Sequence, residues 1–140
     1  MSDTTATPSP SASSGLRGQS AGETALCTVG QTGSGLRYRG YDLEDLAAHA
    51  SFEEVAYLLL KGKLPNREEL DAYIARLKGL RGLPDALKAV LEQIPASAHP
   101  MDVMRTGCSM LGNLETEESF DEQSDQADRM LAVFPSIIGR

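Results

Sequence analysis

Apolar residues recur at three- and four-residue intervals through most of the chain after Asp42. Ser51 and Glu54 make a capping-box pair ahead of one apolar run, and Asn66 and Glu69 repeat the pair ahead of the next. Glycine and proline residues interrupt the runs at short intervals. This pattern predicts a series of short helices, the first capped by Asp42, that are joined by short turns.

Two short segments rich in β-forming residues come before the helices. They read "TALCTVG" (residues 24–30) and "LRYRGY" (residues 36–41), with "QTGSG" between them. Glycines that open a helix can cradle phosphate, but these glycines lie between two strands and predict a plain turn. Arg39, Gly40 and Asp42 then mark a structural joint between strand and helix, with a ligand-binding cluster as the alternative. We expect a mainly α fold in which a short amino-terminal β-hairpin precedes a bundle of short helices.

The segment "HPMDVMRTGCSMLGN" (residues 99–113) predicts a helix with two apolar sides. Pro100 suits the first helical position because its φ angle is preset. One apolar stripe contains Met101, Met104, Cys108 and Leu111, and the other contains Val103, Gly107, Met110 and Leu114. Such a helix needs a packing partner on each side, so we expect one side to form a partner surface. Seven acidic residues between 115 and 128 then predict a solvated loop that leads into a last helix at about Ser124.

Composition narrows the range of partners and locations. The 140 residues are enough for about one domain, and 13 basic against 20 acidic residues give a net charge of −7, which argues against binding to nucleic acid or to an anionic membrane surface. No apolar run is long enough to span a membrane. Two well-separated cysteines favour free thiols and a cytoplasmic location. Residues 1–17, rich in Ser, Thr, Ala and Pro, predict a disordered tail.

Five segments, taken in order, resemble the citrate synthase family. They are "TALCTVG", "YRGYDLEDLA", "SFEEVAYLLLKGKLP", "LRGLP" and "HPMDVMRTG". Each is a weak signal alone, but five at family-like spacing are a strong one, and the first and fourth are most similar to the 2-methylcitrate synthase branch. The resemblance runs from about Gly18 to Arg140. It implies that residues 18–140 are an incomplete, amino-terminal portion of the large helical domain of a citrate synthase-like fold.

The resemblance implies an acyltransferase that joins an acyl-CoA to oxaloacetate and then hydrolyses the thioester. In the 2-methylcitrate branch the acyl group is propionyl and the reaction serves propionate breakdown, whereas citrate synthase, the alternative, uses acetyl-CoA. The family's enzymes are homodimers without a cofactor or metal, because the CoA thioester is a substrate. The helix at 99–113 belongs to the family's subunit interface, which makes interface residues of Met101, Val103, Met104, Gly107, Cys108, Met110 and Leu111.

The family's catalytic histidine motifs, such as "HELNAS" and "HGGANE", do not occur in the sequence. We therefore assign no catalytic residue to the chain and expect it to be inactive alone. His49 is interpreted as a helix-end residue and His99 as part of the "HPMD" motif that fixes a helix start. Arg76 is a weak candidate for binding an anionic substrate, with a solvated arginine as the alternative. A non-catalytic helical module that binds a partner through the helix at 99–113 is the hypothesis from another class.

Overall fold

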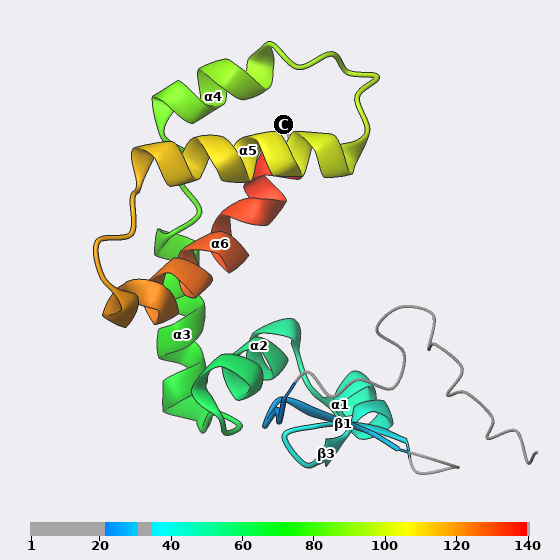
Figure 1. Cartoon of the computed structure of the whole chain (residues 1–140). Coiled ribbons are helices and arrows are strands. Elements are labelled where there is room, and N and C mark those ends of the chain that lie inside the picture. Colours follow the sequence, from blue (N-terminus) through cyan, green and yellow to red (C-terminus); the bar gives the residue numbers. More distant parts are fainter. Residues whose placement is uncertain (1–21, 31–34, 140) are drawn as a thin grey trace, which may run out of the picture.

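The computed structural model describes residues 22–30 and 35–139, and in these ranges a small sheet is followed by a chain of α-helices. The elements are β1 (Cys27–Val29), β2 (Leu36–Tyr38), β3 (Tyr41–Asp42), α1 (Leu43–His49), α2 (Phe52–Lys61), α3 (Arg67–Gly79), α4 (Asp85–Glu92), α5 (Pro100–Leu114), the short 3-10 helix η1 (Phe120–Glu122) and α6 (Gln123–Ile138). Figure 1 shows α4 and α5 at one end, the sheet with α1 and α2 at the other, and α3 and α6 between them. The mainly helical fold expected from the sequence is confirmed. The predicted tail, residues 1–17, lies outside the described residues.

The sheet is antiparallel in the order β1-β2-β3, with Cys27 opposite Tyr38 and Arg37 opposite Asp42. The predicted hairpin is present, and β3 adds a strand that the sequence did not predict. Arg39 and Gly40 connect β2 to β3 with φ angles of 45° and 92°. Two successive residues with positive φ match the twist of a tight hairpin, so the chain turns back before the first helix begins. The predicted glycine turn at residues 31–34 lies outside the described residues.

Side-chain caps start the first three helices at the residues that the sequence indicated. Oδ1 of Asp42 accepts a hydrogen bond of 2.9 Å from the backbone N–H of Glu44 at the start of α1. Both capping boxes form: Ser51 with Glu54 starts α2, and Asn66 with Glu69 starts α3. The hydrogen bonds from Ser51 lower the pKa of Glu54, because they stabilise the carboxylate. These local signals therefore predicted the starts of the helices correctly.

An apolar cluster joins α4, α5 and α6. Its buried members are Leu87, Leu91, Leu111, Val133 and Ile137. A Cβ atom placed on Gly107 would lie only 2.8 Å from Cγ2 of Ile137, so a glycine here lets α5 and α6 approach closely. As predicted, α5 packs on two sides, but α4 and α6 of the same chain supply both partners, so the two-sided packing does not by itself require another subunit (Figure 1).

A second cluster joins α2, α3 and α6 through the buried residues Ala56, Tyr73, Leu77 and Ala132. The last helix thus contributes to both clusters, and it begins at Gln123, one residue before the predicted Ser124. Because α6 crosses from one cluster to the other, it fixes the position of α3 relative to α5 (Figure 1).

Candidate functional site

Asp128 of α6 is the single charged residue with a buried side chain among the described residues, with 1% of its surface exposed. The hydroxyl of Tyr73 donates to Oδ1 of Asp128 over 2.9 Å, and Nε of Arg76 donates to Oδ2 over 3.0 Å. Nζ of Lys61, at the end of α2, lies 3.4 Å from Oδ2. The buried carboxylate is therefore compensated by a hydroxyl and two cations, and it links α6 to both α3 and α2.

Two further side chains of α6 extend this arrangement to the solvent. Nη2 of Arg76 donates to Oδ1 of Asp125 over 2.7 Å, and Nζ of Lys61 donates to Oγ of Ser124 over 2.6 Å. We call the six residues the Asp128 cluster: Lys61, Tyr73, Arg76, Ser124, Asp125 and Asp128. Lys61 and Arg76 are partly exposed to solvent, whereas the carboxylate of Asp128 is buried. The cluster therefore extends from the protein interior to the surface.

Tyr73 is the neutral donor of the Asp128 cluster. Burial raises the pKa of its hydroxyl well above the usual range, and the hydrogen bond to the Asp128 carboxylate raises it further. The edge of one ring packs against the face of the other where Tyr57 meets Tyr73, at 83° and 5.2 Å between centroids. Both oxygens of the Asp128 carboxylate accept hydrogen bonds, one from Tyr73 and one from Arg76. The arrangement holds α2, α3 and α6 together.

The sequence interpretation of residues 115–128 as a solvated acidic segment is wrong for Asp128. Two signals pointed to its real place. Asp128 lies four residues before the buried Ala132, which puts both on one side of a helix, and Tyr73 and Arg76 are three residues apart on another helix. Each signal concerns one helix, and only the fold shows that the two helix faces meet.

Arg76, the weak candidate for binding an anionic substrate, lies in the Asp128 cluster. Its side chain is 45% exposed and forms ion pairs with Asp125 and Asp128. An incoming anion would meet these two carboxylates beside the guanidinium, so it would have to displace one of them. The solvated alternative was incomplete, because Arg76 has two fixed partners. A substrate contact by Arg76 stays a prediction.

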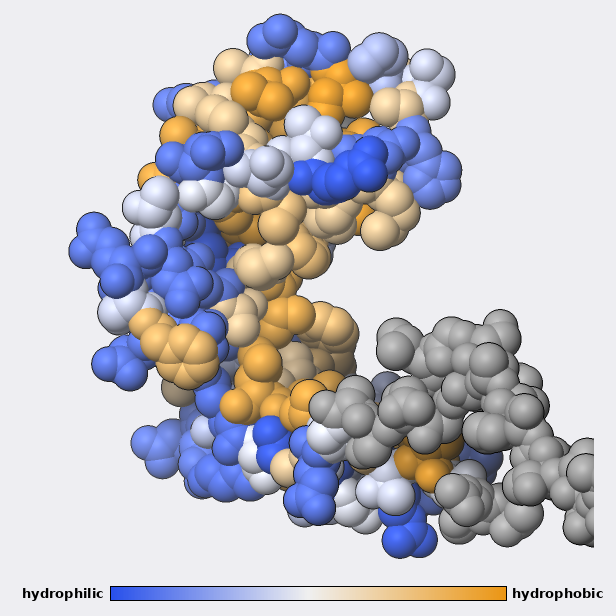
Figure 2. Space-filling view, in the orientation of Figure 1, coloured by the Kyte–Doolittle hydropathy of each residue, from blue (hydrophilic) through white to orange (hydrophobic). Residues whose placement is uncertain are grey.

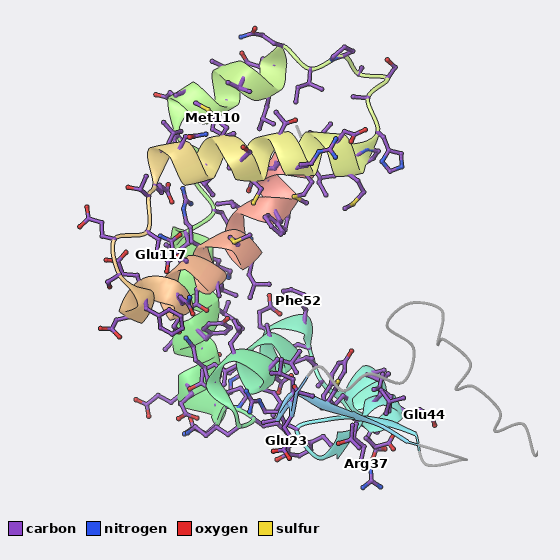
Figure 3. The ribbon with its side chains drawn as sticks, in the orientation of Figure 1. Glu23, Arg37, Glu44, Phe52, Met110 and Glu117 are labelled. Atoms are coloured by element: carbon purple, nitrogen blue, oxygen red, sulfur yellow. The ribbon has the colours of Figure 1, made fainter. Side chains whose placement is uncertain are left out.

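The residues predicted for a subunit interface on α5 differ in their accessibility. Met101 is 65% exposed, and the side chains of Val103, Met104, Cys108 and Met110 are half-buried. Gly107 and Leu111 are buried, both on the apolar cluster that α5 shares with α6. Met110 lies between α5 and α4 in Figure 3. The surface left open for another subunit is therefore centred on Met101, Met104 and Cys108, and the interface itself stays a prediction.

Both histidines are engaged at helix ends, as the sequence indicated. Nδ1 of His99 accepts a hydrogen bond of 3.2 Å from the backbone N–H of Met101, so His99 caps α5 directly before Pro100. Nδ1 of His49 lies 3.0 Å from the carbonyl oxygen of Asp45 in the last turn of α1. These contacts account for the two side chains as structural groups.

A second polar pair holds the loop after α5. Arg129 donates two hydrogen bonds to Glu115, from Nε over 2.8 Å and from Nη2 over 2.6 Å. Nη1 of Arg129 also donates to the carbonyl oxygens of Leu80 and Gly82. The guanidinium lowers the pKa of the Glu115 carboxyl, because it stabilises the charged form. Arg129 thus ties α6 to the turn after α3 and to the end of α5.

Residues 22–30 and 35–139 contain neither a metal-binding cluster nor a membrane-spanning helix. No group of three or more His, Cys, Asp or Glu side chains in these ranges could hold a metal ion. No helix there is long and apolar enough to cross a membrane.

The close α5–α6 crossing and the Asp128 cluster hold the helices of this fold together. The family model described as "Citrate synthase, C-terminal domain" matches residues 15–140, so the chain belongs to the citrate synthase family. It is 74% identical over 124 residues to 2-methylcitrate synthase of Shewanella oneidensis, a match that covers 89% of this chain and 33% of that protein. It is 39% identical over 141 residues to citrate synthase of Mycolicibacterium smegmatis, which covers 99% of this chain and 37% of that protein. The chain spans about a third of the length of the curated relatives it matches.

Solved structures of the family have the same fold. Citrate synthase from Thermotoga maritima matches with a TM-score of 0.77 and 31% identity, over 89% of this chain and 32% of that one. The ternary complex of carboxymethyl coenzyme A and oxaloacetate with citrate synthase from Thermoplasma acidophilum matches with a TM-score of 0.77 and 28% identity, over 88% and 33%. The resemblance drawn from the five sequence segments is therefore confirmed.

Proposed function

We propose that the chain is an amino-terminal portion of a 2-methylcitrate synthase. The whole enzyme removes a proton from the carbon next to the thioester of propionyl-CoA, and this carbon then bonds to the ketone carbon of oxaloacetate. Water cleaves the thioester, which gives 2-methylcitrate and free CoA. The observation that carries the proposal is the 74% identity to the Shewanella 2-methylcitrate synthase over 124 residues.

Citrate synthase, with acetyl-CoA as its substrate, is the second candidate. It is favoured by the 39% identity to the Mycolicibacterium citrate synthase, a match that covers 99% of the chain. The identity to the Shewanella protein is nearly twice as high over a similar length, so the propionyl substrate is preferred.

Within the enzyme this chain serves as scaffold. Enolate formation next to a thioester needs a carboxylate base and a hydrogen-bond donor that stabilises the developing oxyanion. Asp128 is buried and ion-paired within the chain, and His49 and His99 are engaged at helix ends. The rest of the polypeptide therefore supplies the reacting groups, and the 140-residue chain alone releases no CoA from propionyl-CoA and oxaloacetate.

The proposal includes a cytoplasmic homodimer that acts in propionate breakdown. Support for the dimer comes from α5, where the exposed Met101 and the half-buried Met104 and Cys108 leave an apolar stripe on the outside of the molecule. The two free cysteines, Cys27 and Cys108, are consistent with a reducing compartment. Neither a cofactor nor a metal is part of the proposal, because the thioester itself activates the carbon acid.

The proposal is tested by expressing the full-length synthase that carries this chain and measuring CoA release with propionyl-CoA and with acetyl-CoA at saturating oxaloacetate. The two thioesters differ by one methylene, which a pocket discriminates by roughly 10–200-fold in kcat/KM. A preference for propionyl-CoA in this range is expected. A preference for acetyl-CoA would assign the chain to citrate synthase instead. The 140-residue chain, assayed alone under the same conditions, is the negative control.

A further inference from the structure

An apolar groove lies between α2 and α6. It is on the concave side of the molecule, where Figure 2 shows many apolar residues at the surface. Phe52, Val55 and Leu59 line it from α2, and Ala127, Met130 and Phe134 line it from α6. Its volume is about 400 Å³, and every lining residue is apolar. We call it the α2–α6 groove. A soluble protein rarely leaves such a contiguous apolar surface uncovered, so the groove needs an occupant.

The side chains of the groove are accessible in this chain. Phe52 is 65% exposed and Met130 is 36% exposed. Phe52 is labelled in Figure 3 at the start of α2, on the side toward α6. Each helix also buries its opposite side within the chain: Leu58 of α2 and Val133 of α6 have no exposed surface. Helices that bury one apolar face and leave a second one open are typical of the interior of a larger domain. The groove therefore has the character of an unfinished core.

We propose that the α2–α6 groove is filled by an apolar helix from the part of the longer polypeptide that this chain lacks. The relatives it matches are about three times as long, so the missing part is large enough to supply such a helix. A helix fits because side-chain ridges of one helix pack into the groove between others. The inference rests on the proposed function only in taking the chain as part of a longer synthase.

Two other occupants fit the groove less well. A second copy of the chain related by two-fold symmetry would place this concave surface against itself, which leaves its centre unfilled. A small apolar molecule of suitable volume would find no polar group to fix its orientation, whereas ligand pockets usually offer a few. A covalently connected helix also meets the groove without the entropy loss of association.

The test places the same substitution in a short and a long chain. In the long chain, the 140 residues replace the matched third of the Shewanella 2-methylcitrate synthase. Met130→Glu should change the thermal midpoint of the 140-residue chain by no more than about 2 °C, because the groove is open there and the carboxylate can turn toward water. In the long chain it should lower the midpoint by about 5 °C or more, because the carboxylate would be covered by apolar side chains. The matched control is Ala75→Glu, which adds the same charge on the exposed side of α3.

The outcomes separate the possible occupants. An equal effect of Met130→Glu in both chains, or an effect in the long chain no larger than that of Ala75→Glu, would overturn the proposal. If the 140-residue chain sediments as a dimer that Met130→Glu dissociates, the occupant is a second copy and the proposal is wrong. If the long chain with Met130→Glu does not fold, Met130→Gln should lower its midpoint by a smaller amount and leave that of the short chain unchanged. A preference of the parent enzyme for acetyl-CoA would refute the proposed function without altering these midpoints.

Discussion

The carboxyl-terminal half of α6 packs Val133 and Ile137 into an apolar cluster with α4 and α5, whereas its amino-terminal half places Asp128 among polar partners from α3 and α2. The apolar half depends on shape, because Gly107 must leave room for Ile137. The polar half depends on matched donors and acceptors, because a buried carboxylate without partners is costly. The two halves of α6 thus pack through different interactions, one through apolar shape complementarity and the other through buried hydrogen bonds. Substitutions in the two halves should therefore destabilise the fold by different amounts.

The largest effect is expected when the Asp128 cluster loses its centre. Asp128→Ala leaves the hydroxyl of Tyr73 and the guanidinium of Arg76 without their shared acceptor, and it should cost about 2–4 kcal/mol of unfolding free energy. The value lies below that of a fully buried pair, because Arg76 and Lys61 can turn toward solvent. Urea denaturation followed by circular dichroism measures it.

The control for that variant is Asp125→Ala, which removes the exposed partner of the same arginine. It should cost less than about 1 kcal/mol, as exposed ion pairs usually do. Equal losses from the two variants would show that the buried position of Asp128 has no special weight.

The apolar half is probed by adding a single methyl group. Gly107→Ala brings a Cβ within 2.8 Å of Cγ2 of Ile137, and overpacking of this kind costs about 1–3 kcal/mol. Gly112→Ala on the same helix meets nothing within 4 Å, so it should stabilise the chain by up to about 1 kcal/mol through helix propensity. Thermal denaturation of the two variants tests this, because the difference between their unfolding midpoints reports how tightly α5 packs against α6. If both substitutions stabilise equally, the crossing has room that the structure does not show.

The same contact changes how the predicted subunit interface should be tested. Gly107→Glu would disturb the packing of α5 on Ile137 of its own chain, so a loss of dimers would not identify an interface. Met101→Asp is better suited, because Met101 is 65% exposed and is not part of the apolar cluster, so a loss of dimers would point to the interface.

The smallest effect concerns acid. The pKa of Glu115 is lowered by Arg129, so this pair stabilises the fold above the unfolded value of about 4.3 and loses its contribution as the pH falls through the lower folded value. Glu115→Gln should therefore cost about 1 kcal/mol at neutral pH, and this cost should shrink as the pH falls below the unfolded value. Unfolding free energies measured from pH 7 to pH 2 test this. Glu117→Gln, which removes an exposed carboxylate of the same loop (Figure 3), is the matched control.

Features that depend on residues within about four positions of one another could be predicted from the sequence. The caps at Ser51 and Asn66 and the start of α5 at Pro100 each depend on a few adjacent residues, and all three were predicted correctly. The role of Asp128 depends on Tyr73, which is 55 positions away in the chain. No local sequence pattern shows that these two residues come into contact in the fold. The close approach of Gly107 to Ile137 was hidden for the same reason. Periodicity identifies which face of a helix is buried, but it does not identify the other helix that packs against that face.

Residue 39 shows how one position can serve two opposed requirements. The backbone of Arg39 has a φ of 45°, which glycine would adopt more easily. Its side chain nevertheless donates to the carbonyl oxygen of Leu59 over 2.9 Å and lies beside Gly62, so a cation sits where the α2 dipole ends. Glycine would relax the turn but would lose the hydrogen bond that ties the sheet to α2. Asparagine would tolerate the turn, but its side chain is too short to reach the carbonyl oxygen of Leu59. In a directed-evolution experiment that selects for stability, position 39 should therefore resist change, although its backbone conformation alone suggests an easy improvement.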